Sequence, residues 1–145
     1  MSGDLGLRRP ALLGWLRLMR VHQKVNRASG EQLKGWDLSL AQFDVLAHVG
    51  ATEGISQQEL ADSLLVTKGN VCQLLDRMEG RGLILRRQEG RAKRLFLTEE
   101  GRKLFDEAVP AQQTMIAERF SVLSEEEQSQ LYELLRKFDR ALDAI

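Results

Sequence analysis

Three Ser-x-x-Gln/Glu patterns predict where helices begin in this 145-residue chain, and they constrain the fold more than any other feature. In such a capping box the serine oxygen accepts a backbone N–H of the first helical turn, while the Gln or Glu side chain accepts the serine N–H. The boxes start at Ser39, Ser56 and Ser124, and Thr67 and Thr98 are placed to cap two further helices. We therefore expect short helices joined by tight turns.

Apolar residues between these caps follow a helical period except in one region. The predicted helices cover residues 10–30, 38–49, 56–64 and 67–80, the stretch that begins at Thr98, and the stretch after Ser124. The exception is a pair of short strands, residues 83–87 and 93–97, around a glycine-containing tip at 88–92. We expect Gly50 to end the second helix and Pro110 to kink the helix after Thr98.

This order of elements predicts a fold that is mainly α with a small β-hairpin wing (α+β), the winged helix-turn-helix. Such a module places its second helix in the DNA major groove and its hairpin along the backbone or in the minor groove. We expect a single domain over residues 1–145, with a DNA-binding lobe at 38–103 and dimerisation helices at 10–34 and 104–145.

Charged residues are unevenly spread, although 21 basic and 21 acidic side chains give a formal net charge of zero. Residues 66–103 hold ten basic and five acidic side chains, a net of +5, and residues 104–145 hold four and nine, a net of −5. Residues 1–34 (seven and two) and 35–65 (none and five) show the same alternation. Because local potential governs the choice of partner, the region of the second helix and the wing is predicted to offer a basic surface to nucleic acid.

The predicted helix from Thr67 has one apolar face and one face suited to DNA. The apolar stripe, which we expect to pack inward, consists of Val71, Leu74, Leu75 and Met78. The candidate DNA-binding residues are Thr67, Lys68, Gly69, Asn70, Gln73 and Arg77. The threonine would fix the helix start, the lysine would anchor a phosphate, and the glycine would allow close approach of the helix N-terminus. The amide and guanidinium groups have the geometry that reads base edges.

Basic residues are concentrated in the predicted hairpin. The candidate DNA-binding residues there are Arg86, Arg87, Arg91, Lys93 and Arg94, opposed within the hairpin only by Glu89. Such a run is also typical of an edge strand that charge protects from aggregation. Because the hairpin directly follows a helix-turn-helix, DNA contact is the favoured interpretation, with Arg91 at the tip as the candidate for the minor groove.

Six segments in order resemble the MarR (multiple antibiotic resistance regulator) family. They are LSLAQFDVL (38–46), ELA (59–61), VTKGNV (66–71), LDRMEGRGL (75–83), LTEEGR (97–102) and LSEEE (123–127). Each segment alone is a weak pattern, but six at the family's spacing, over about residues 10–145, are specific. The resemblance implies a homodimeric transcriptional regulator, more commonly a repressor than an activator, that binds a pseudo-palindromic DNA operator.

The resemblance also implies two functional features. The family's wing carries Asp-x-Arg, and the matching residues here are Glu89 and Arg91, in a wing shorter than is common. A pocket for a small aromatic or other apolar effector is implied between the dimer helices and the DNA-binding lobe. The residues that could meet there are Trp15, Met19, His22, Trp36 and Phe43. Packing is the simpler interpretation for both tryptophans.

Dimerisation is predicted from the residues as well. The first helix and the last two carry apolar stripes that exceed what a helix-turn-helix core can cover, and an apolar patch left in water marks an interface. A two-fold dimer would present two recognition helices one DNA turn apart, about 34 Å.

Cys72, on the flank of the predicted recognition helix, has two interpretations. A lone cysteine is usually a small buried hydrophobe, which is the interpretation we favour, and a redox switch is the alternative. One cysteine excludes an internal disulfide and a cysteine-based zinc cluster, and His22 and His48 lack further ligands at metal-binding spacing, so we expect no metal.

Other classes of function have little support. No glycine-rich phosphate loop, nucleophile elbow or metal-ligand spacing is present, so we expect neither an enzyme nor a cofactor. The apolar run 11–16 after Arg9 is too short for a signal segment or a membrane span, so we expect a cytoplasmic protein without membrane contact. The alternative to DNA binding is a winged-helix module that docks protein partners through the same surface.

Overall fold

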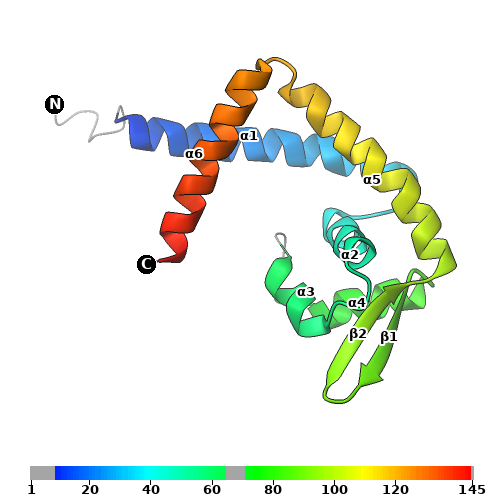
Figure 1. Cartoon of the computed structure of the whole chain (residues 1–145). Helices are drawn as coiled ribbons and strands as arrows, with labels where there is room; N and C mark the ends of the chain where they lie inside the picture. Colours follow the sequence, from blue (N-terminus) through cyan, green and yellow to red (C-terminus); the bar gives the residue numbers. More distant parts are fainter. Residues whose placement is uncertain (1–8, 65–70, 145) are drawn as a thin grey trace. The chain divides into compact units, whose positions relative to one another are not determined.

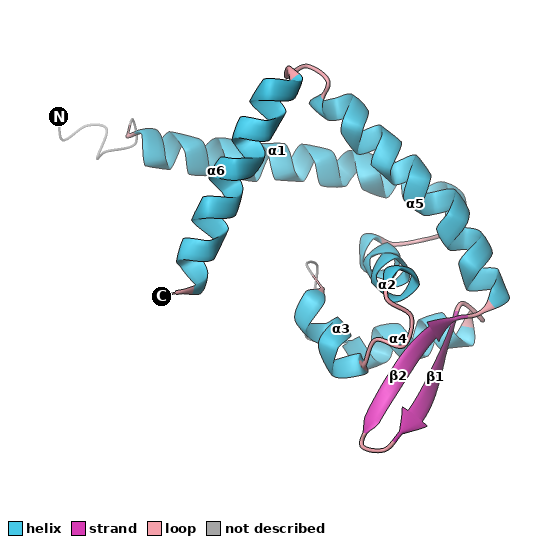
Figure 2. Ribbon diagram, viewed as in Figure 1, coloured by secondary structure: helices cyan, strands magenta, loops and turns pink. Residues whose placement is uncertain are grey.

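The computed structural model describes residues 9–64 and 71–144 and is mainly helical with one antiparallel hairpin (Figures 1 and 2). The elements in order are α1 (Pro10–Leu33), a 3-10 helix η2 (Lys34–Trp36), α2 (Leu40–Ala51), α3 (Gln57–Ser63), α4 (Val71–Gly80), β1 (Ile84–Glu89), β2 (Ala92–Leu97), α5 (Glu99–Phe120) and α6 (Glu125–Asp143). This is the winged helix-turn-helix that the sequence predicts. The chain comprises two units, residues 1–112 and residues 113–145.

All three predicted capping boxes are formed. The Ser39 hydroxyl accepts the Gln42 N–H at 3.1 Å, and the Gln42 side chain accepts the Ser39 N–H at 3.0 Å. The same reciprocal bonds begin α3 at Ser56 and α6 at Ser124. In the α3 box, hydrogen bonds from the backbone and side chain of Ser56 lower the pKa of Glu59. The local sequence therefore sets the starts of these helices.

Gly50 does not end the second helix, so that prediction is wrong. Helix α2 continues through it to Ala51. A Cβ on Gly50 would lie 2.3 Å from two ring carbons of Phe105. The glycine thus serves close packing against α5 and not helix termination. Helix α1 likewise runs past the expected residue 30 to Leu33.

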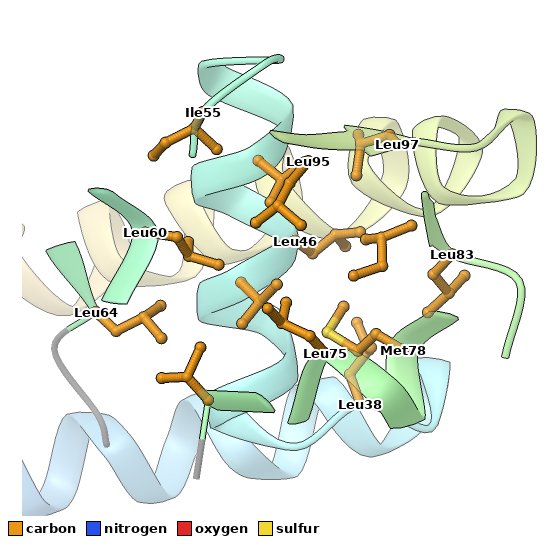
Figure 3. Packing of buried hydrophobic residues seen from close by; sticks show 14 of the residues in the cluster. Leu38, Leu46, Ile55, Leu60, Leu64, Leu75, Met78, Leu83, Leu95 and Leu97 are labelled. Atoms are coloured by element: carbon orange, nitrogen blue, oxygen red, sulfur yellow. The ribbon is translucent and has the colours of Figure 1, made fainter. Parts of the chain in front are cut away.

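One cluster of buried side chains joins the elements of the first unit (Figure 3). It draws on the end of α1, on α2, α3 and α4, on both strands and on the first half of α5. The largest fully buried side chains are Leu33, Leu46, Leu60, Leu75, Met78, Ile84 and Leu95. Burial of each such side chain contributes about 1.5–3 kcal/mol. The hairpin therefore belongs to the same core as the three central helices.

The hairpin has one face toward this core and one toward solvent. Its register pairs Ile84 with Leu97 and Arg86 with Leu95, so these residues share the inner face. A two-residue turn closes the hairpin, with Gly90 at a φ of 60° as a type II′ turn requires. Backbone bonds between residues 54–55 and Leu95, at 2.8 and 2.9 Å, tie the hairpin to the loop between α2 and α3. The wing thus has a fixed base and a short tip.

Gly82 and Leu83 form a junction where α4, β1 and α5 meet. The Leu83 N–H donates to the Met78 carbonyl, and the Gly82 N–H donates to the Glu79 carbonyl. With Gly82 at a φ of 74°, these two bonds form a Schellman motif at the C-terminus of α4. The Thr98 hydroxyl donates to the Gly82 carbonyl at 2.6 Å and accepts the Gly101 N–H at 2.9 Å, so the predicted cap of α5 is confirmed.

Gly101 lies so close to this junction that a Cβ would come 2.0 Å from the Leu83 carbonyl oxygen. We expect Gly101→Ala to lower the free energy of unfolding by on the order of 2 kcal/mol, since backbone must shift to admit the methyl group. Gly30→Ala is the control, because that helical site is open; it should be neutral or stabilising by up to about 1 kcal/mol. Denaturant unfolding measures both, and equal effects would contradict the packing.

Candidate nucleic-acid interface

Helix α4 has the two faces that the sequence predicts. Val71, Leu75 and Met78 are buried, and Leu74 packs partly buried against the same core. Gln73 and Arg77 are exposed on the other side. The remaining candidates of this helix, Thr67, Lys68, Gly69 and Asn70, lie outside the described residues. The described part of α4 therefore offers an amide and a guanidinium group to a partner.

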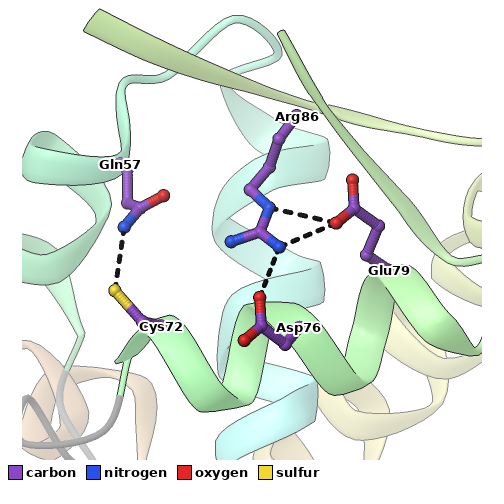
Figure 4. Close-up of polar contacts among 5 residues, drawn as sticks. All are labelled: Gln57, Cys72, Asp76, Glu79 and Arg86. Atoms are coloured by element: carbon purple, nitrogen blue, oxygen red, sulfur yellow. Dashed lines mark hydrogen bonds and ion pairs between the residues drawn. The ribbon is translucent and has the colours of Figure 1, made fainter. Parts of the chain in front are cut away.

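Cys72 is exposed, so the favoured prediction of a buried thiol is wrong. Cys72 directly follows the buried Val71 on α4, and its side chain points away from the core and toward α3 (Figure 4). There the Gln57 Nε2 donates a hydrogen bond to its sulfur at 3.3 Å (Figure 4). The thiol is thus part of the surface between the two helices of the helix-turn-helix.

A cleft of about 560 Å³ separates the wing from α3 and α4. Amide side chains, the thiol and two cations line it, among them Gln57, Gln58, Cys72, Gln88, Arg91 and Lys93. No carboxylate occurs among the lining residues of this described region. A cleft of this size with basic and amide groups is suited to an extended anionic polymer rather than to a cation.

The five predicted basic residues of the wing have different surroundings. Arg91 and Lys93 are exposed at the tip. The Arg87 guanidinium lies over the Phe96 ring, 5.2 Å from its centroid, on the outer face of the hairpin. Arg94 donates to the Gly54 carbonyl at 2.9 Å and pairs with Glu89 at 3.3 Å.

The carboxylate of Glu89 therefore pairs with Arg94 and not with Arg91, which the resemblance implies as its partner. The register explains this difference. Glu89 lies opposite Ala92, and the neighbouring pair on the same face is Arg87 with Arg94. Arg91 occupies the turn itself. Its side chain is left at the tip without the expected carboxylate.

Arg86 is bound within the protein. Its guanidinium contacts Asp76 at 2.5 Å and Glu79 at 2.7 Å, both on α4 (Figure 4). The Arg86 side chain is only 17% exposed. The hydrogen bonds to Glu79 and then to Asp76 raise the pKa of the arginine, so it is always charged. The structure places this candidate between the wing and α4, not on the outer surface.

The five predicted effector-pocket residues divide into two groups. Trp36 and Phe43 are partly buried against the core, and the indole N–H of Trp36 donates to Glu107 at 3.2 Å. Trp15, Met19 and His22 are exposed on α1. None of the five lines the cleft described above. The effector pocket stays a prediction.

Sequence reasoning missed the contributions of α3 and of Arg81. Gln57 and Gln58 of α3 line the cleft, and their signal was available, because polar residues in the first helix of a helix-turn-helix face the start of the second. Arg81 donates to the Asp37 carbonyl at 2.7 Å and to Gln42 at 3.4 Å, which holds the end of α4 against the start of α2. No sequence pattern indicated this contact.

The described part of the chain, residues 9–64 and 71–144, has neither a clustered metal site nor a membrane-spanning helix. These residues contain no group of three or more His, Cys, Asp or Glu side chains placed to hold a metal ion. Among them there is also no helix long and apolar enough to cross a membrane.

Comparison with known proteins shows the family of the chain. A profile described as MarR family matches residues 36–95. A Bacillus cereus (strain ATCC 10987 / NRS 248) protein named as an uncharacterized HTH-type transcriptional regulator is 42% identical over 124 residues, which are 85% of this chain and 84% of that protein. The transcriptional regulator HosA of Escherichia coli O157:H7 is 35% identical over 104 residues, 70% of this chain and 77% of HosA.

Solved structures agree with this assignment. The S. aureus MepR–DNA complex contains a chain with 30% sequence identity and a TM-score of 0.76, covering 88% of this chain and 96% of that one. These relatives are transcriptional regulators and not enzymes. The core, the helix-turn-helix and the wing are thus those of a known group, and the chain belongs to the MarR family of winged helix-turn-helix transcriptional regulators.

Proposed function

We propose that the protein is a homodimeric, sequence-specific DNA-binding repressor that responds to a small molecule or a stress signal. The observation that carries the proposal is the carboxylate-free cleft between the wing and the helices α3 and α4, lined by Gln57 and Cys72 on the helices and by Arg91 and Lys93 on the wing. Further along α4, outside the cleft lining, Gln73 and Arg77 are exposed. MepR, a relative with the same fold, was crystallised with DNA, which supports a similar role here.

In this proposal α4 enters the major groove and the wing follows the backbone into the minor groove. Gln73 and Arg77, with Asn70, read or brace base edges, while Thr67, Lys68 and Gly69 serve the helix start and the nearest phosphate. One DNA strand passes along the cleft. Arg91 reaches the minor groove from the tip, and Arg87, Lys93 and Arg94 supply positive potential along the strand.

Two exposed apolar faces support the homodimer. On α1 the exposed stripe consists of Leu12, Trp15, Leu16 and Met19, and Leu13, Leu18 and Val21 are exposed on other sides of the helix. On α6, which has no buried residue, the exposed residues are Tyr132, Leu134, Leu135, Phe138 and Leu142. Faces this large are unfavourable in water, and a second copy of the chain would bury them. A two-fold dimer presents two copies of α4 to a pseudo-palindromic operator.

The effector is proposed to be a small aromatic or other apolar compound that binds near Trp15, Met19, His22, Trp36 and Phe43. Three of these side chains are exposed on α1: Trp15 and Met19 belong to the face assigned to the dimer, and His22 lies in the next turn of the helix. A ligand that prefers one spacing of the two recognition helices would shift the population between DNA-binding and non-binding forms.

The test of DNA binding is selection of duplexes from a random library, followed by affinity measurements across a salt series. Phosphate contacts give a log K that falls with log salt by about 0.9 for each phosphate neutralised. We expect Arg91→Ala to weaken binding and to flatten this slope. Lys103→Ala, which removes an exposed cation from α5, is the matched control and should change neither.

If wild type selects no duplex at low salt, the proposed function fails. In that case the same surface would serve a protein partner, the alternative for a winged helix, and the salt dependence of that interaction would not scale with phosphate contacts.

Dimerisation predicts a dimer mass in sedimentation at micromolar concentration. We expect Leu16→Glu, in the middle of the α1 face, to shift the protein toward monomer and to weaken DNA binding, because a charge would have to be buried in the interface. Val122→Glu is the control, since Val122 is 87% exposed and lies on neither apolar face. A monomeric wild-type protein would refute the homodimer.

Alkylation of the single cysteine provides an independent test of the cleft. We expect attachment of N-ethylmaleimide to Cys72 to lower affinity for the selected duplex, because the added group occupies space proposed for the DNA strand. Cys72→Ala, treated identically, should bind as untreated protein does. Unchanged binding of the fully alkylated protein would place DNA elsewhere.

A further inference from the structure

The contact of Arg86 with two carboxylates of α4 connects the wing to the recognition helix. We infer that Arg86 is a positioning residue for DNA recognition: it holds the wing and α4 at a fixed mutual angle and offsets part of the negative charge of Asp76 and Glu79, and it does not contact phosphate itself. The inference rests on the proposed function and revises the role that the sequence predicts for this residue.

The geometry supports an internal role. Arg86 Nη2 donates to Asp76 at 2.5 Å and to Glu79 at 2.7 Å, and Nε donates to the same Glu79 oxygen at 3.2 Å. The arginine side chain is 17% exposed, whereas those of Asp76 and Glu79 are 63% and 40% exposed. The cation is therefore covered, and its two partners lie on the solvent side.

The position of Arg86 in the hairpin explains why it can connect the two elements. It lies opposite Leu95 on the inner face of the hairpin, two residues after the buried Ile84. Its planar guanidinium group bonds two carboxylates spaced i, i+3 on α4, which the point charge of a lysine cannot reproduce. These polar bonds add to the apolar contacts that Ile84 and Leu95 of the hairpin make in the shared core.

The electrostatic consequence concerns the face of α4 that carries Asp76 and Glu79. Without Arg86, two uncompensated carboxylates would lie on the recognition helix beside the proposed path of a phosphate backbone. Unpaired carboxylates repel DNA of any sequence. A wing at the wrong angle to α4 instead lowers the affinity only for the specific duplex, because only that duplex requires α4 and the wing to bind together. Affinity for specific and non-specific duplexes therefore separates the two effects.

The most informative variant is Asp76→Asn with Glu79→Gln, which leaves Arg86 in place. It adds two units of positive charge to each chain, so electrostatics alone predicts tighter binding to every duplex. Loss of the two carboxylates that bond Arg86 instead predicts a loss of selectivity for the selected duplex, because the wing is no longer held against α4. We expect its affinity for that duplex to fall by about tenfold relative to a scrambled duplex of equal length.

Arg86→Lys and Arg86→Met complete the set, with Arg87→Met as the matched control. Arg87 is the next residue of β1, lies on the outer face and has no carboxylate partner in the described part of the chain. We expect Arg86→Lys to lose nearly as much selectivity as Arg86→Met. We expect only Arg87→Met to flatten the salt slope, by up to about 0.9 for each subunit.

Thermal unfolding separates misfolding from mispositioning. If Arg86→Met is unfolded at the assay temperature, the carboxylate variant and Arg86→Lys decide the question. The inference is overturned if Arg86→Lys binds as wild type does, if Arg86→Met flattens the salt slope equally for both duplexes, or if the carboxylate variant keeps the wild-type ratio of affinities for the selected and scrambled duplexes. If wild type selects no duplex, the proposed function itself fails, and the positioning role fails with it.

Discussion

The junction at Gly82 and Leu83 is the constraint on which the rest of this lobe depends. Helix α4 ends there, β1 begins there, and the cap of α5 is bonded to the same two residues. Gly101 packs so closely on the Leu83 carbonyl that no side chain fits between them. Because α4, the wing and α5 meet within a few residues, the orientation of any one of them is coupled to the others.

Local ion pairs, more than the net charge of the chain, decide which basic side chains remain available to an anionic partner. Of the basic side chains in the wing, Arg86 is bonded to α4 and Arg94 to Glu89, which leaves Arg87, Arg91 and Lys93 without a carboxylate partner in the described region. These three and exposed Arg77 are the described cations of α4 and the wing that contribute most to the potential available to a polyanion, and Arg94, paired with Glu89, contributes less. A formal charge of zero is therefore compatible with a DNA-binding surface, because most acidic residues lie outside residues 66–103 and three of the five within that range are paired with Arg86 or Arg94.

Features set by local interactions could be predicted from the sequence, and features set by tertiary contact could not. The capping boxes at Ser39, Ser56 and Ser124 were predictable because all their bonds lie within four residues. The role of Gly50 could not be predicted, because the ring of Phe105 that requires a glycine there belongs to α5, fifty-five positions later. The exposure of Cys72 and the partners of Arg86 and Glu89 likewise depend on how α3, α4 and the wing meet. The sequence could therefore predict the basic and amide residue types of the candidate site. It could not predict which of these residues form ion pairs with one another or with other elements.

Hydroxyl-radical footprinting on a selected duplex tests the central claim most directly, because it shows where the protein covers the DNA backbone. The account predicts two symmetry-related protected regions whose centres are one helical turn apart, about 34 Å, with protection extending into the flanking minor grooves where the wings lie. Protection of a single unsymmetrical region would contradict the homodimer. Uniform cleavage of a duplex that the protein is shown to bind would contradict the placement of α4 and the wing on the DNA.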